Sequence, residues 1–206
     1  MRQRAQQESA FLNIPYDRRY ETLYLAFIAG LCAFGLTPRA TIEIPSAKRR
    51  LERIIELIRG CEYSFHDLSK VQLDRHSPAT PRFNMPFELG LAVDWARGAN
   101  PKHEWFVFES RAHRLEKSLS DLNGTDPHVH EGTAHGVLRG LTNALTRKIH
   151  RPNLTELDAI YRDLREAARK IKLELKGGSL FEARPFQDLA VLARQLAQDR
   201  ISSLRS

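Results

Sequence analysis

The sequence predicts an α/β fold, with a doubly wound parallel sheet followed by a C-terminal helical extension. Two observations predict it. Strand-like and helix-like apolar patterns alternate through residues 1–150, which is typical of parallel strands joined by crossover helices. Residues 151–206 contain only helical patterns, so we expect them to extend the α/β domain with helices.

The first strand is predicted at residues 9–14, where a short apolar run ends in a polar loop. Apolar residues then recur at helical spacing from Tyr20 to Leu31, and Gly35 ends this helix. A second strand is predicted at 37–44, because apolar and polar residues alternate along its latter part.

A second helix follows, with Ser46 as its N-cap and Gly60 just past its last turn. Residues 61–69 predict a third strand that leaves a polar tail in a loop. Residues 87–98 predict the third helix, and 103–110 a fourth strand bounded by charged residues.

A short edge strand and turn are expected within 119–126, and a glycine-containing helix at 132–149. Two amphipathic helices follow at 153–176 and 185–204. These two helices could pack on the domain, form a helical hairpin or make a dimer interface. We expect a homo-oligomer that assembles through them.

The composition excludes several classes of protein. No apolar run approaches the roughly 18 residues of a membrane span, and the polar first residues do not fit a signal peptide. We therefore expect a cytoplasmic protein without a membrane partner. Cys32 and Cys61 are expected as buried free thiols. The net charge of +7 is interleaved with acidic residues, which favours a phosphorylated small molecule over nucleic acid as the partner.

Glu88 is a carboxylate in an otherwise apolar segment. If Met85 caps the third helix, Pro86 falls at its first position and Glu88 at its third, where the helix dipole favours a carboxylate. Spacing alone leaves this interpretation open beside that of a reactive group. Asn84 and Phe87 lie close by, in a loop expected at the carboxyl edge of the sheet, and they favour a site.

The segment RFNMPFELGLAV, preceded by YSFHDLS and followed by FVFES and SLSDLNGTD, resembles the TIR-like nucleotide-binding domains of bacterial defence proteins. It is also similar to the nucleoside 2-deoxyribosyltransferases, which share that flavodoxin-like architecture. The residues that fit the TIR-like motif around the reactive carboxylate are Arg82, Asn84, Phe87, Glu88, Leu89 and Gly90. The loop FLNIPYD and the tail HDLS resemble the family's other two motifs. Pro86 and the NIPYD loop depart from the common versions, which leaves the substrate open.

The resemblance implies cleavage of an N-glycosidic bond, with Glu88 in the role of the family's catalytic Glu. NAD would then be a substrate that releases nicotinamide, with no cofactor, in bacterial or antiviral defence. Nicotinamide leaves as a neutral molecule, so one carboxylate suffices. Transfer of a nucleoside base needs a second acid, for which Asp67 and Asp121 are the candidates. The alternatives are a nucleoside 2-deoxyribosyltransferase and a non-catalytic nucleotide-sensing or interaction module.

The first strand is followed by Asn13, Tyr16 and Asp17, which are expected to hold ribose hydroxyls or a phosphate. Arg18 and Arg19 could pair with a pyrophosphate near the amino end of the first helix. The equal alternative is that Asp17 caps this helix and that both arginines are solvated.

After the third strand, His66 and Ser69 are expected to contact the ligand, and Asp67 could instead cap the next segment. The histidines at 128, 130 and 135 have no spacing of a known zinc motif, so no metal is expected.

Overall fold

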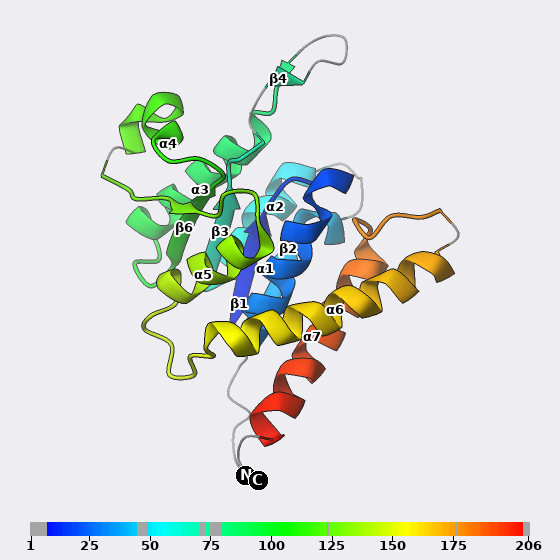
Figure 1. Cartoon of the computed structure of the whole chain (residues 1–206). Helices are drawn as coiled ribbons and strands as arrows, with labels where there is room; N and C mark the ends of the chain where they lie inside the picture. The colour runs from blue at the N-terminus through cyan, green and yellow to red at the C-terminus, as the bar shows by residue number, and fades with distance from the viewer. Residues whose placement is uncertain are drawn as a thin grey trace.

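The computed structural model describes residues 8–44, 49–70, 73–74, 80–122, 124–175 and 177–203. Five parallel strands form the main sheet in the order β2-β1-β3-β6-β7 (Figure 1). Their bounds are β1 Ser9–Asn13, β2 Thr37–Ala40, β3 Tyr63–Asp67, β6 Glu104–Glu109 and β7 His128–Val129. This order is that of the flavodoxin-like doubly wound fold, so the predicted fold class is confirmed.

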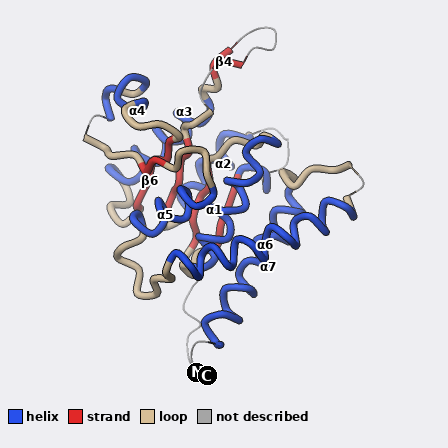
Figure 2. Tube along the Cα trace, in the orientation of Figure 1, coloured by secondary structure: helices blue, strands red, loops and turns tan. Residues whose placement is uncertain are grey.

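Helices cover both faces of the sheet, so that the strands lie between them in Figure 2. Their bounds are α1 Glu21–Ala33, α2 Arg50–Arg59, α3 Asn84–Gly98, α4 Arg114–Ser118, α5 Ala134–Ala144, α6 Leu154–Glu174 and α7 Ala183–Ser203. Successive side chains of β1 point to opposite faces of the sheet and so belong to two separate parts of the core. Phe11 packs with Ile54 and Ile58 on the α2/α3 face, whereas Leu12 belongs to the core under α1 and α5.

Helix α1 is the centre of the larger core. Every residue from Leu23 to Ala33 is buried, which is typical of a helix that is apolar on all sides. Helices α6 and α7 pack against it, and Leu164 and Leu189 are fully buried in the same core (Figure 1). The Tyr24 hydroxyl donates to the carbonyl of Leu180 at 3.0 Å. The apolar faces of the C-terminal helices therefore cover the α/β domain itself, and oligomerisation through them stays a prediction.

Two predicted strands differ from the structure. The strand expected at 37–44 ends at Ala40, because the backbone N–H of Ala40 donates to the Glu43 side chain at 2.7 Å and a 3₁₀ turn, Thr41–Glu43, follows. Within 119–126 there is a 3₁₀ turn, Ser120–Leu122, and the edge strand is β7, in which His128 pairs with Phe108.

The other segments are close to their predicted positions. Ser46, the expected cap of the second helix, lies outside the described residues, and α2 begins at Arg50. A small antiparallel pair, β4 (Leu73–Asp74) and β5 (Thr80–Pro81), precedes α3. Cys32 and Cys61 are buried and free, as expected. Within the described ranges, no helix has the length and apolar character needed to cross a membrane.

Candidate functional site

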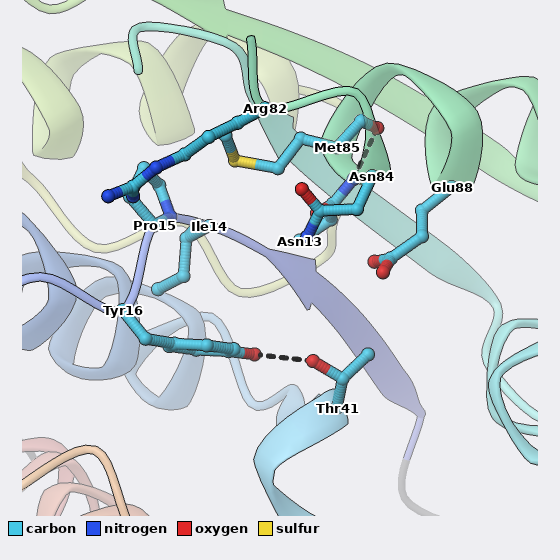
Figure 3. A pocket seen from close by; sticks show the side chains of 9 residues that line it. All are labelled: Asn13, Ile14, Pro15, Tyr16, Thr41, Arg82, Asn84, Met85 and Glu88. Carbon is cyan, nitrogen blue, oxygen red and sulfur yellow. Dashed lines mark hydrogen bonds between the residues drawn. The ribbon is translucent and has the colours of Figure 1, made fainter. Parts of the chain in front are cut away.

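A pocket of about 380 Å³ lies at the carboxyl end of β1, beside the point where the strand order reverses between β1 and β3. In doubly wound folds this is the usual place for a ligand. The pocket is lined by Asn13, Ile14, Pro15, Tyr16, Thr41, Arg82, Asn84, Met85 and Glu88 (Figure 3). The β1–α1 loop, the turn after β2 and the amino end of α3 therefore meet here.

Glu88 does not occupy the third position of its helix, where the helix dipole would favour it. The N-cap of α3 is Phe83, so the expectation of a Met85 cap is wrong. Asn84 becomes the first helical residue, and Glu88 the fifth. Pro86 is third, still within the first turn, where a missing N–H costs no helical hydrogen bond. Because the dipole effect fades beyond the first turn, helix capping does not account for the carboxylate.

The carboxyl group of Glu88 is buried, and no hydrogen bond within the described residues offsets its loss of contact with water. Glu88 is 7% exposed, and its carboxylate has no hydrogen-bond partner in the described part of the chain. Burial raises the pKa of Glu88 from 4.5 to about 7, while the nearby positive charge of Arg50 acts in the opposite direction. Acid and carboxylate forms are therefore both populated near neutral pH.

Tyr16 faces the same pocket from the β1–α1 loop (Figure 3). Its hydroxyl lies 3.0 Å from Oγ1 of Thr41. Burial raises the pKa of Tyr16 far above its usual range, and the charge of Glu88 raises it further. The phenol thus stays protonated and can donate a hydrogen bond to Thr41 or to a ligand.

Asn13 joins the sheet to the helix that carries Glu88. It is 3% exposed, and its Nδ2 donates to the carbonyl of Met85 at 2.8 Å and to Nδ1 of His66 at 3.0 Å. Both amide hydrogens are used in this way, so the side-chain oxygen is the group left for a ligand. His66 lies opposite Asn13 in the β1–β3 register, and burial lowers its pKa to about 3. His66 therefore supports Asn13 as a neutral ring and does not itself line the pocket.

Asp67 does not face Glu88, contrary to the expectation for a second acid. Successive residues of β3 point to opposite faces, so His66 lies on the α3 side and Asp67 under α1. There the buried Asp67 carboxylate accepts from the Tyr20 hydroxyl and from the backbone N–H of Ser69, at 2.8 Å for the latter. Its Oδ2 also lies 3.0 Å from Nε2 of His130.

Several other predicted site residues lie away from the Glu88 pocket. Asp17 caps the 3₁₀ turn Arg18–Tyr20 by accepting from the backbone N–H of Arg19 at 2.8 Å, which is the capping alternative. Arg18 is exposed, Phe87 is 54% exposed on the outer face of α3, and Asp121 is exposed in the 3₁₀ turn that follows α4. Ser69 is buried and lines a different cavity.

The structure thus brings together Asn13, Tyr16, Asn84 and Glu88 of the predicted set. The site prediction missed Thr41, because the second strand was expected to continue through it. It also left out Arg82, although Arg82 belongs to the TIR-like motif. In the described ranges, no three His, Cys, Asp or Glu side chains are grouped so that they could hold a metal ion.

No family model and no curated protein matches the chain. Among solved structures, the chain is similar to a 2-deoxyribosyltransferase from Leishmania mexicana, with 17% identity and a TM-score of 0.39. The match covers 61% of this chain and 75% of that one. Both family resemblances, to TIR-like domains and to 2-deoxyribosyltransferases, rest on the sequence motifs.

Proposed function

We propose that this chain cleaves the N-glycosidic bond of a nucleoside or nucleotide, with Glu88 as the reactive carboxylate. The observation that carries the proposal is a buried carboxylate that lines a pocket of about 380 Å³ and has no hydrogen-bond partner in the described residues. That volume lies within the range of small-molecule sites. Breaking the bond between sugar and base builds positive charge at the anomeric carbon, which a carboxylate can stabilise or capture covalently.

The other lining groups suit the sugar. The free oxygen of Asn13 accepts hydrogen bonds, the hydroxyls of Tyr16 and Thr41 can donate or accept them, and the amide of Asn84 does both. A ribose or 2-deoxyribose offers hydroxyls for groups of this kind. Arg82 adds a cation at the same pocket, which suits a phosphate or a base carbonyl.

The substrate decides how the leaving group departs. Nicotinamide leaves NAD as a neutral molecule, whereas a purine or pyrimidine needs a proton. Glu88 is the carboxylate among the described lining residues, since Asp67 and Asp121 lie elsewhere. Transfer of 2-deoxyribose between bases would therefore draw this proton from the Tyr16 phenol or from water, whereas the Arg82 guanidinium keeps its protons and can only donate hydrogen bonds.

Product analysis by liquid chromatography tests the proposal. The protein is incubated with 2-deoxynucleosides plus free bases and, separately, with NAD, as wild type, Glu88→Gln and Glu166→Gln. Glu166 is an exposed glutamate on α6, so Glu166→Gln is the matched control. We expect base exchange or nicotinamide release by wild type and control, and a loss of at least about a hundredfold in Glu88→Gln.

Base exchange would identify a 2-deoxyribosyltransferase, and nicotinamide release a NAD glycohydrolase. Undiminished turnover in Glu88→Gln would contradict the proposed role of this residue. Nucleotide binding without any product would contradict the enzymatic proposal and identify a sensing module instead.

A further inference from the structure

A second cavity, of about 290 Å³, lies on the α1/α5 side of the carboxyl edge of the sheet. It shares no lining residue with the Glu88 pocket. It is lined by Arg19, Tyr20, Leu23, Ser69, Lys70, Ser110, Arg111, His130 and Gly132. These residues come from the start of α1 and from the loops after β3, β6 and β7, so four separate segments build it.

Three cations converge on this cavity. Arg19, Lys70 and Arg111 come from three different loops, and no carboxylate in the described ranges lies within ion-pair distance of any of them. Like charges that are brought together without a counter-charge repel one another. A bound anion would relieve this repulsion, so the arrangement points to an anionic ligand.

A buried hydroxyl faces the same space. Ser69 is 5% exposed, its backbone N–H donates to Oδ1 of Asp67 at 2.8 Å, and its carbonyl accepts from Arg114 at 3.1 Å. Its side-chain Oγ is the remaining polar group, and it has no partner in the described part of the chain. This hydroxyl is therefore available to donate to, or accept from, a ligand or water in the cavity.

The amino end of α5 contributes a favourable field. Gly132 lines the cavity, and α5 starts immediately afterwards with Thr133 as its N-cap. The Thr133 hydroxyl accepts from the N–H of Gly136, so it satisfies one of the free donors of this eleven-residue helix. The remaining first-turn N–H groups and the helix dipole favour an anion at this end.

The floor of the cavity is held in place by buried hydrogen bonds. The N–H of Gly132 donates to Nδ1 of His130 at 2.9 Å, which leaves the ring proton on Nε2, facing Asp67. Asp67 lies behind the floor, where it accepts hydrogen bonds from Tyr20 and Ser69 and lies 3.0 Å from Nε2 of His130. The oxygens of Asp67 are thus engaged within the floor, and the neighbouring Glu109 carboxylate is engaged by the Ser110 N–H and by Arg114.

We propose that this second cavity, defined by Arg19, Lys70, Arg111 and Ser69, binds a phosphoryl group. Phosphate offers several acceptor oxygens at once, which matches cations and a hydroxyl that approach from different loops. The ligand is inorganic phosphate, pyrophosphate or the phosphate of a nucleotide. The inference does not depend on Glu88 being catalytic, because the two pockets share no residue.

Amide chemical-shift mapping by nuclear magnetic resonance tests this proposal on the full chain. Inorganic phosphate, pyrophosphate and adenosine 5′-monophosphate are titrated against potassium chloride of equal ionic strength, with adenosine as the arm that lacks phosphate. We expect saturable shifts of the Ser69, Ser110 and Gly132 amide signals with at least one phosphate compound and none with adenosine. The tightest-binding compound identifies the source of the phosphoryl group.

The test variant is Lys70→Ala/Arg111→Ala, and the control is Arg97→Ala/Arg184→Ala, which removes two exposed arginines elsewhere. We expect the test variant to bind at least tenfold more weakly, the control to bind as wild type, and Ser69→Ala to bind a few-fold more weakly. The proposal is overturned if no phosphate compound shifts these signals. It is also overturned if the test variant binds as tightly as wild type, or if the shifts occur only around Glu88.

Discussion

Asp67 and Glu88 are two of the buried carboxylates near the carboxyl edge of the sheet, and they differ in how they are satisfied. Asp67 is fully buried, accepts hydrogen bonds from Tyr20 and Ser69, and lies 3.0 Å from Nε2 of His130. Glu88 is almost as buried, yet it has no hydrogen-bond partner in the described residues and faces a pocket. A satisfied carboxylate holds structure together, whereas one left unsatisfied destabilises the fold and is available to a ligand. The contrast indicates a structural role for Asp67 and fits the proposed chemical role of Glu88.

The largest effect on stability is expected at Asp67. Asp67→Ala leaves the Tyr20 hydroxyl and the backbone N–H of Ser69 without their acceptor and removes the charge beside His130, so we expect a loss of about 3 to 5 kcal/mol. Urea unfolding followed by circular dichroism measures this loss. The exposed Asp94→Ala on α3 is the control and should change stability by less than about 0.5 kcal/mol. A loss below about 1 kcal/mol for Asp67→Ala would break the contrast between the two carboxylates.

Glu88 is expected to act in the opposite direction, and in a way that depends on pH. Its folded pKa of about 7 lies above the unfolded value of 4.5, so folding favours the protonated form. The resulting stability is fully present below about pH 4.5 and is lost as pH rises through about 7. The difference between the two pKa values corresponds to about 3 kcal/mol.

Glu88→Gln removes this dependence. In thermal unfolding, the free energy of unfolding of Glu88→Gln should rise relative to that of wild type between about pH 4.5 and 7. Above that range the variant should stay more stable by a constant amount of about 3 kcal/mol. Glu166→Gln, on the exposed face of α6, should show no pH-dependent difference from wild type. If the difference in stability between Glu88→Gln and wild type is the same at pH 5 and pH 8, Glu88 ionises as an ordinary surface glutamate does.

The smallest effect is expected at Tyr16. Tyr16→Phe removes the hydrogen bond with Thr41, so we expect a loss of about 1 kcal/mol in urea unfolding. Tyr161→Phe is the control, because the Tyr161 hydroxyl has no hydrogen bond among the described residues. If both variants lose the same stability, the Tyr16–Thr41 contact contributes nothing to the wall of the Glu88 pocket.

The sheet and its main helices could be predicted from the sequence because their apolar periods are regular. The same periodicity also determines which face of the sheet each side chain of a strand occupies. The motif resemblance predicts that residues 66 and 67 both lie near one ligand. Side chains alternate along a strand, however, so these two neighbours lie on opposite faces of β3. The alternation of Phe11, Leu12 and Asn13 would have placed Asn13 with His66 and away from Asp67.

Other features depend on contacts between segments that are distant in the chain. The end of β2 is set by the bond from Ala40 to Glu43, so Thr41 could not be assigned to the pocket from alternation. The amino end of α3 is held by the bond from Asn13 to Met85, across 72 positions of the chain. The second cavity needs loops after three strands, and of its lining residues the sequence points only Arg19 and Ser69 toward a ligand, whereas His130 is considered only as a metal ligand.

The enclosure of α1 by α6 and α7 has a consequence for how the protein is made. During synthesis, α1 is made about 150 residues before α7 begins, which takes roughly 8 to 30 seconds at about 5–20 residues per second. Until α6 and then α7 have been made, the apolar stretch Leu23–Ala33 of α1 lacks the cover that these helices give it. The nascent chain therefore presents a binding site for chaperones until its last helices emerge, and a ribosome that stalls before α7 leaves behind an aggregation-prone product.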